Sequence, residues 1–226
     1  MRRLYLYLTI STLLFLGESR AQYAWDFGGN LGFANYLGEI GGGASEARDW
    51  LLDLKLSQTR WNPGVFARYR LGYNWGLNMS LNYARLQGAD SIVTNPNRFT
   101  RNLHFRNDIF ELAGTVEYYF FSQPDVGRTG RYLLDLKAFV YAGFGAFYNN
   151  PKAQYQGNWV ALRPLKTEGQ ESPYSAIQAV VPVGFGFFYT FSRIHRFGMN
   201  AGWRISFTDY IDDVSGTYPD PNILES

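Results

Sequence analysis

Two histidines, His104 and His195, are the only imidazoles that this chain offers for nucleophilic catalysis. A serine-type hydrolase or acyltransferase would need one of them beside a serine and a carboxylate. His195 stands between two arginines in a short basic segment, which is typical of a turn. His104 shares the lipid-facing side of its predicted strand with Asp108, whereas Ser91 lies in a distant segment. Since no GxSxG or HExxH pattern occurs either, the sequence predicts that the protein is not an enzyme.

An acidic cluster near the end of the chain is the other candidate for chemistry. Its members are Asp209, Asp212, Asp213 and Asp220. They lack the D-x-[DN]-x-[DN]-G order of an EF-hand loop, so we expect solvated or arginine-paired carboxylates rather than a calcium site. The absence of cysteine excludes thiolate zinc sites, iron–sulfur clusters and cysteine nucleophiles. We therefore expect no cofactor, no metal and no small-molecule substrate.

The first residues have the three parts of a secretory signal peptide. Arg2 and Arg3 form the basic region, residues 4–16 form a short apolar region, and Ser19 and Ala21 are the small residues of a cleavage site. Residues 22–226 are then one domain, since single β domains often reach roughly 200 to 250 residues. Cleavage after residue 21 removes three of the 21 basic and one of the 19 acidic side chains, which leaves 18 of each. This balance disfavours a nucleic-acid partner.

Apolar and polar residues alternate with a period of two in the rest of the chain. In the clearest example, Phe197, Met199, Ala201, Trp203, Ile205 and Phe207 share one face. This period indicates β-strands, and no apolar stretch after residue 21 is long enough for a membrane helix. Seven strands are expected, most of them long enough to cross a bilayer at a tilt. They are residues 25–33, 63–73, 77–84, 103–121, 132–149, 176–191 and 197–208.

The predicted connections alternate between long and short, as in outer-membrane barrels with long outer loops and short periplasmic turns. They are residues 37–62, 74–75, 89–102, 122–131, 150–175 and 192–196. Asn74 and Trp75 suit a tight two-residue turn. The fold class predicted is all-β, a transmembrane antiparallel β-barrel in the outer membrane of a Gram-negative bacterium. The N-terminus of the mature chain is expected in the periplasm.

The two strand faces indicate which side meets lipid. One face is apolar, and its aromatic residues gather near the short turns as an interface girdle. The other face is made of Gly, Asn, Ser and a few charges, and the chain has only four lysines, which is a poor coat for a soluble domain. Seven charged residues have the parity of the lumen, and we expect them to pair and plug it. They are Asp26, Arg68, Arg70, Glu111, Glu117, Lys137 and Arg204.

Four separate strings resemble one protein family. They are residues 101–109 (RNLHFRNDI), 150–153 (NPKA), 165–170 (LKTEGQ) and 208–215 (TDYIDDVS). In this order they resemble the PorG-type outer-membrane proteins of the type IX secretion system of Bacteroidota, over nearly the whole mature chain. The resemblance implies a non-enzymatic barrel that anchors the periplasmic ring to the outer membrane, in a machine for protein secretion and gliding motility. Its partners would be outer-membrane lipids, the ring lipoprotein and that lipoprotein's partner subunit.

The resemblance also implies a further strand. Family members continue past the DDVS motif into a last strand, which would make an eight-stranded barrel, whereas seven strands are legible here. Either the final strand is missing by truncation, or part of residues 47–60 closes the barrel instead. We favour truncation, since an open edge in lipid leaves backbone groups unpaired. A small barrel of another role, either a lipid-modifying enzyme or a narrow channel, is the alternative function.

The short turns are the expected contact surface for a periplasmic partner, because topology places them on that side. Their charged and aromatic residues are candidates for docking. These partner-facing candidates are Trp75, Asp125, Arg128, Arg131, Arg193, His195 and Arg196.

Overall fold

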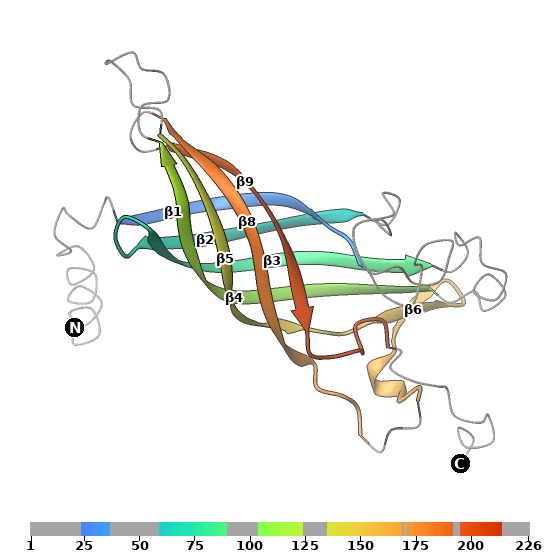
Figure 1. The fold of residues 1–226 in the computed structure, drawn as a ribbon. Helices are drawn as coiled ribbons and strands as arrows, with labels where there is room; N and C mark the ends of the chain where they lie inside the picture. Colours follow the sequence, from blue (N-terminus) through green and yellow to red (C-terminus); the bar gives the residue numbers. More distant parts are fainter. Residues whose placement is uncertain are drawn as a thin grey trace, which may run out of the picture.

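The computed structural model describes residues 24–36, 59–89, 104–123, 135–168, 170, 172–191 and 195–213. Seven long strands in this part of the chain form the main sheet (Figure 1). They are β1 (Trp25–Ala34), β2 (Arg60–Arg70), β3 (Trp75–Ala89), β4 (His104–Gln123), β5 (Asp135–Tyr148), β8 (Ile177–Phe191) and β9 (His195–Ser206). The prediction of an all-β chain with seven long strands is confirmed.

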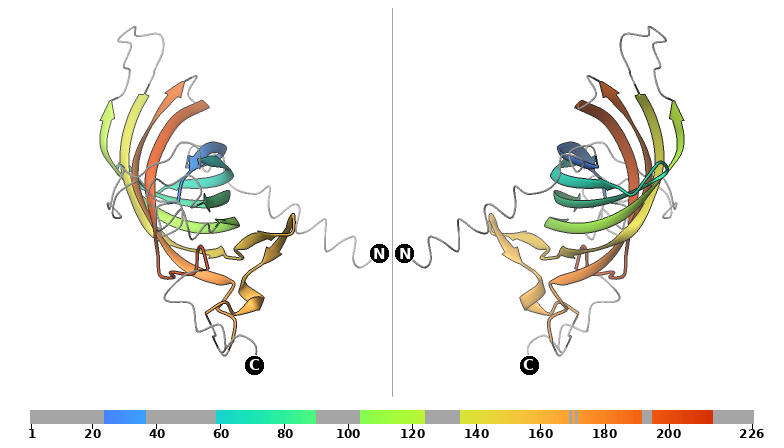
Figure 2. Two further views of the ribbon diagram at one scale, coloured as in Figure 1. Left: turned by 90° about the vertical axis from the view of Figure 1, so that its right-hand side faces the viewer. Right: turned by 90° about the vertical axis from the view of Figure 1, so that its left-hand side faces the viewer.

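Each long strand pairs with its neighbours in chain order, and every pairing is antiparallel. The sheet curls along its width into a half-barrel, so it has a convex and a concave face (Figure 2). β1 and β9 are the two outer strands of this order, and no backbone pairing joins them within the described residues. The architecture is that of an antiparallel β-barrel, as the alternating sequence predicts.

The convex face carries apolar side chains along the strands. Phe27, Phe144 and Met199 are 77%, 77% and 64% exposed. On β9, Phe197, Met199, Trp203 and Ile205 are exposed, and Arg204 of the opposite parity reaches Glu111 on the concave side, as the predicted faces require. A contiguous apolar surface of this kind is unusual for a monomeric soluble protein and typical of a wall that meets lipid.

The short connection after β2 differs from the prediction. β2 ends at Arg70, residues 71–74 form the turn, and Trp75 already belongs to β3. The backbone N–H of Leu71 donates to the carbonyl of Trp75 over 3.0 Å across this connection, which is longer than the two-residue turn expected at Asn74 and Trp75. The aromatic contact of Trp75 with Tyr118, at 4.8 Å between ring centroids, holds it in the strand. We call this end of the sheet the turn end.

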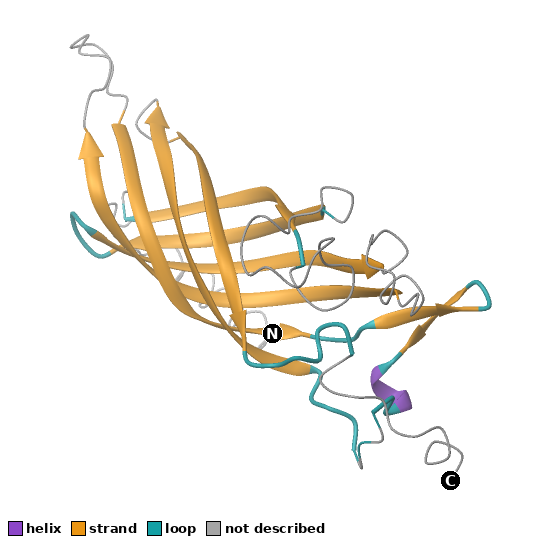
Figure 3. Cartoon of the chain, turned by 45° about the vertical axis from the view of Figure 1, so that its right-hand side comes forward, coloured by secondary structure: helices purple, strands orange, loops and turns teal. Residues whose placement is uncertain are grey.

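The opposite end, the loop end, contains a hairpin that the sequence did not predict. β6 (Lys152–Tyr155) and β7 (Asn158–Ala161) lie in the expected long connection 150–175, followed by the short 3-10 helix η5 (Arg163–Leu165) (Figure 3). The pairs Arg106↔Lys152 and Phe110↔Tyr148 keep one register, so β6 prolongs β5 along β4. Gln156 and Gly157 turn the hairpin with φ of 49° and 84°, as a type I′ turn requires.

No helix in the described part of the chain is long and apolar enough to cross a membrane.

Candidate functional site: the concave face and the loop end

The turn half of the concave face is built around a buried ion pair. Arg68 of β2 approaches Glu117 of β4 with 2.8 Å between Nε and Oε2, and their side chains are 9% and 1% exposed. The Tyr119 hydroxyl donates to the same carboxylate over 2.8 Å. The Arg68 guanidinium also lies 5.0 Å from the ring centroid of Phe188. A buried charge needs such a set of partners, because burial without them is costly.

Two further ion pairs cross the concave face between strands that are not neighbours. Arg204 of β9 reaches Glu111 of β4, with 3.3 Å between Nε and Oε2. Arg196 of β9 contacts Asp26 of β1, so a charge pair spans the two outer strands of the sheet. The expected pairing of lumen charges is thereby confirmed for Arg68, Glu117, Arg204, Glu111 and Asp26. Their side chains reach across the space that the curled sheet encloses.

Small residues on the same face make room for large ones. The Tyr141 hydroxyl lies against Gly184 and Gly202, where a Cβ on Gly184 would come within 2.6 Å of the oxygen and one on Gly202 closer still. The glycines that alternate with apolar residues along β8 and β9 are therefore a packing requirement of the interior, rather than flexible points.

The loop half of the concave face is held by hydrogen bonds of buried amides and of the Asp213 carboxylate, rather than by ion pairs between strands. Asn107 of β4 donates to the Asn149 side-chain oxygen over 2.6 Å and to the Ile211 carbonyl over 2.9 Å. Asn149 in turn donates to the Tyr210 carbonyl over 2.7 Å. Both asparagines are fully buried. Since they bond backbone groups of residues 210 and 211, they fix the segment that follows β9 against β4 and β5.

Asp213 completes this cluster from a strained backbone position, with φ of 70°. Its carboxylate accepts hydrogen bonds from Thr167 Oγ1 at 2.6 Å and from the Tyr174 hydroxyl at 2.7 Å. Tyr174 stacks on Tyr210 with 4.5 Å between ring centroids. Burial raises the pKa of the Asp213 carboxyl, against the effect of these two hydrogen bonds, and burial also raises the pKa of Tyr174. The acidic tail is therefore partly buried and hydrogen-bonded, and Asp213 is not the solvated or arginine-paired group that was expected.

The loop-end cluster unites the four strings of the family resemblance. Asn107, Asn150, Thr167 and Asp213 come from residues 101–109, 150–153, 165–170 and 208–215 in that order. The Asn150 N–H donates to the Asn107 oxygen over 3.2 Å, and Thr167 donates to Asp213. Sequence reasoning found these strings but did not predict that they meet. The signal that could have found them is the presence of adjacent polar residues, Asn149 and Asn150, directly after an apolar strand.

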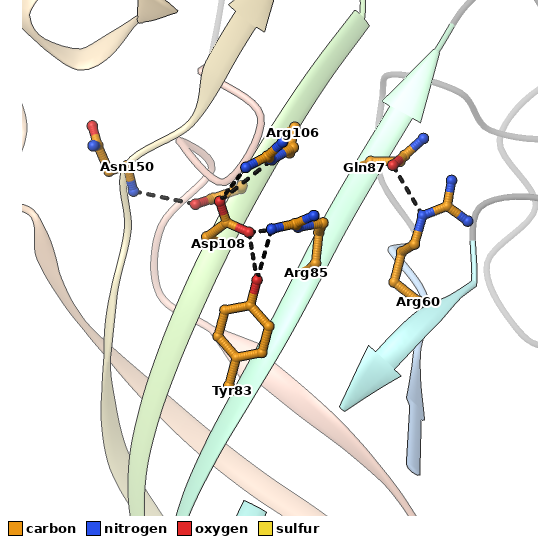
Figure 4. A network of polar contacts seen from close by, with 8 residues as sticks. Arg60, Tyr83, Arg85, Gln87, Arg106, Asp108 and Asn150 are labelled. Carbon is orange, nitrogen blue, oxygen red and sulfur yellow. Dashed lines mark hydrogen bonds and ion pairs between the residues drawn. The ribbon is translucent and has the colours of Figure 1, made fainter. Parts of the chain in front are cut away.

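The outward side of the loop end carries a second polar cluster (Figure 4). Asp108 of β4 accepts from Arg85 Nε at 2.6 Å and from the Tyr83 hydroxyl at 2.7 Å through one oxygen. Its other oxygen accepts from Arg106 Nη2 at 3.0 Å. Lys152 lines the open pocket above this carboxylate. We call Arg85, Arg106, Asp108 and Lys152 the rim cluster.

Neither histidine has a catalytic partner in the part of the chain that the structure describes. His104 Nε2 accepts from the Gln154 backbone N–H over 3.1 Å. The His195 ring lies 5.6 Å from the Phe191 ring. The described residues contain no group of three side chains that could hold a metal ion.

Three of the seven partner-facing candidates are described. Trp75 and His195 begin β3 and β9 at the turn end and are exposed. Arg196 turns into the interior toward Asp26, with its side chain 16% exposed. Its charge is thus compensated within the chain. The other four lie outside the described residues; they are Asp125, Arg128, Arg131 and Arg193.

The curled antiparallel sheet, its apolar convex face and its ion-paired interior define a protein of the β-barrel class, with a fold compatible with an outer-membrane location. A family model matches residues 3–226, and the chain belongs to this family, the domain of unknown function DUF6089. Neither the curated proteins nor the solved structures contain a significant match.

Proposed function

We propose that the protein spans the outer membrane and serves as a non-enzymatic anchor for the periplasmic ring of the type IX secretion machinery. The observation that carries this proposal is the loop-end cluster, in which residues of all four strings that resemble PorG-type proteins come together. Strings that meet in one hydrogen-bonded cluster are parts of a single structural unit. Their joint resemblance to one family therefore supports the proposal more strongly than four unconnected resemblances would.

The apolar convex face supports the membrane part of the proposal. Its exposed aromatic and aliphatic residues would face lipid, and the paired charges would be sheltered in the interior. With the N-terminus on the periplasmic side, the turn end faces the periplasm and the loop end faces outward. Protein export in this scheme passes through the partners of the barrel, and the barrel itself supplies the attachment.

The turn end is the proposed docking surface, carried by Trp75 and His195 together with Asp125, Arg128, Arg131 and Arg193. Charged groups at an interface rim guide encounter and orientation, so reversal of their sign weakens association. Arg196 is left out of this surface, because its substitution would break the Asp26 pair and disturb the barrel.

The test is co-purification of the ring lipoprotein with the barrel from detergent-solubilised outer membrane. Arg128→Glu with Arg131→Glu should reduce the co-purified lipoprotein and block secretion. Arg193→Glu should have a smaller effect in the same direction. A matched control is Arg163→Glu with Lys166→Glu, which has the same spacing and charge change at the loop end. It should leave co-purification intact.

Insertion of each variant is checked by heat-modifiable migration on gels. Normal co-purification with the turn-end variants inserted would refute docking through these turns. His104→Ala separates the anchor from an enzyme, since secretion should continue when this imidazole is removed. Secretion lost in His104→Ala, with the turn-end variants normal, would overturn the anchor.

A further inference from the structure

The rim cluster lies where the outward-facing side chains of the convex face change from apolar to charged. On β4 the outward-facing side chains are apolar as far as Phe110, and the next two outward positions are Asp108 and Arg106. On β3 the same change follows Leu81, where Tyr83 and Arg85 take the outward positions. Tyr83 and Phe110 lie 5.1 Å apart between ring centroids, directly beside the charges. Such a border between aromatic and charged groups is typical of the level of lipid headgroups.

The charges of the rim cluster do not balance. Arg85, Arg106 and Lys152 supply three positive charges, and Asp108 supplies one negative charge. Asp108 already accepts hydrogen bonds from Arg85 Nε and from Arg106 Nε and Nη2. The hydrogen bonds of the two arginines to Asp108 and Tyr83 run through their Nε and Nη2 groups, including one from Arg85 Nη2 to the Tyr83 hydroxyl at 3.0 Å. Since Arg85 is also 39% exposed, the cluster can still donate to an anion from outside.

A pocket of about 350 Å³ borders the rim cluster at Asp108 and Lys152. It is open to the outside and is lined by Tyr83, Asp108, Phe110, Tyr148, Asn150 and Lys152, so Arg85 and Arg106 stand outside its lining. One part of its wall is aromatic and the other is polar. The hairpin β6–β7 helps to build it, because Lys152 is the register partner of Arg106. Trp159 of β7 packs under the Arg106 guanidinium at 5.1 Å and holds it in place.

From this arrangement we infer that the rim cluster is a binding site for the phosphate of an outer-leaflet lipid headgroup, the phosphorylated glucosamine of lipopolysaccharide. Arginine is suited to phosphate because its planar fork of N–H groups matches two phosphate oxygens. The Asp108 carboxylate orients both guanidiniums, and Lys152 adds a point charge. The aromatic side of the pocket would meet the first part of the acyl chains. This inference rests on the membrane location in the proposed function, but not on its secretion partner.

Binding of diphosphorylated lipid A to the purified full-length barrel in detergent, followed by native mass spectrometry, tests the site. Dephosphorylated lipid A and inorganic phosphate are the comparison probes. Wild-type protein should prefer the phosphorylated lipid by about tenfold or more, since hydrogen bonds to a charged group are lost with the phosphate. Inorganic phosphate at millimolar concentration should displace little of it.

Two lysine variants have a small structural cost, whereas a double arginine variant also removes both ion pairs of Asp108. Lys152→Gln should weaken binding of the phosphorylated lipid several-fold, whereas Lys166→Gln, which removes the lysine directly after η5 and outside the cluster, should not. Arg85→Gln with Arg106→Gln should abolish the preference for phosphate. Folding is followed by heat-modifiable migration.

Equal binding of phosphorylated and dephosphorylated lipid A would overturn the inference, as would equal effects of the two lysine variants. Full displacement by inorganic phosphate would identify a site for the free anion and refute the lipid source. A protein that binds the lipid but fails to co-purify with the ring would refute the proposed function alone.

Discussion

The two halves of the concave face pair their buried polar groups in different ways. At the turn end, charged side chains on long strands pair across the interior, as in Arg68 with Glu117. At the loop end, buried amides bond the backbone of the segment after β9, as in Asn107 with Ile211, and the buried Asp213 carboxylate accepts from two hydroxyls. Ion pairs join strands to strands, whereas amides join strands to connections. The turn half therefore holds the sheet in its curl, and the loop half closes one end of it.

The largest expected effect is in the turn half. Glu117→Ala leaves the Arg68 guanidinium buried beside aromatic rings without its carboxylate. Breaking a buried pair from one side costs about 3 to 5 kcal/mol of unfolding free energy. Urea titration of the barrel refolded into lipid vesicles measures this. The paired change Arg68→Met with Glu117→Leu is the control, and it should cost much less. A single variant as stable as the wild type would show that the pair is not needed.

The next effect concerns the convex face that both halves share. Trp203→Arg places a charge on the apolar wall and should cost roughly 2 to 4 kcal/mol if that wall meets the middle of a bilayer. Asn200→Arg on the same strand has the opposite parity and should be tolerated much better. The same titration compares them. Equal losses in the two variants would contradict the assignment of the faces.

A smaller effect is expected in the loop half. Asn107→Ala removes three hydrogen bonds. It leaves the buried acceptors of Asn149 and Ile211 without this donor and the Asn150 N–H without its acceptor. The expected loss is about 1 to 3 kcal/mol. Hydrogen exchange followed by mass spectrometry should show it as faster exchange in residues 207–213, with the turn end unchanged. Faster exchange spread evenly over both ends would mean that the two halves are not separate units.

The smallest effect is a dependence on pH confined to the loop half. The pKa of Asp213 is raised above its ordinary value of 3.8, so the folded state holds this proton more tightly than the unfolded state. Stability should therefore fall as the pH rises from about 3.8 through the raised value. The raised pKa of Tyr174 adds a second loss above about pH 10.

Protease accessibility of residues 207–213 across these pH ranges measures the effect, and Asp213→Asn should flatten the acidic part of the profile. A wild-type loop end that becomes more protected as the pH rises through the acidic range would contradict this assignment.

Much of the turn half could be predicted from the sequence. The period of two separates Arg68 and Glu117 from the apolar wall, and strands of known length in chain order can only pair as a meander. The alternation did not predict the length of the connection between β2 and β3. The first short turn has four residues because Trp75 packs on Tyr118, and aromatic contacts across strands are not visible in alternation.

The loop half was found only in pieces. Strings such as residues 150–153 and 208–215 were recognised by their resemblance to a family. Their structural role depends on which segments the curvature of the sheet brings into contact. The hairpin β6–β7 was missed because its turn uses Gln156, a residue that seldom adopts positive φ.

By itself, the sequence determined the strand faces, because the side chains of a strand alternate with the backbone and need no distant partner. It also indicated that Asp26, Arg68, Glu111, Glu117 and Arg204 lie inside, since this follows from the same alternation, but it did not place Arg196 there. Only the tertiary structure decided that Arg204 meets Glu111, that Arg196 turns to Asp26, and that Asn107 holds residues 210 and 211. These contacts join residues up to 170 positions apart, between Asp26 and Arg196. The curvature of the sheet sets such distances, and no local pattern encodes that curvature.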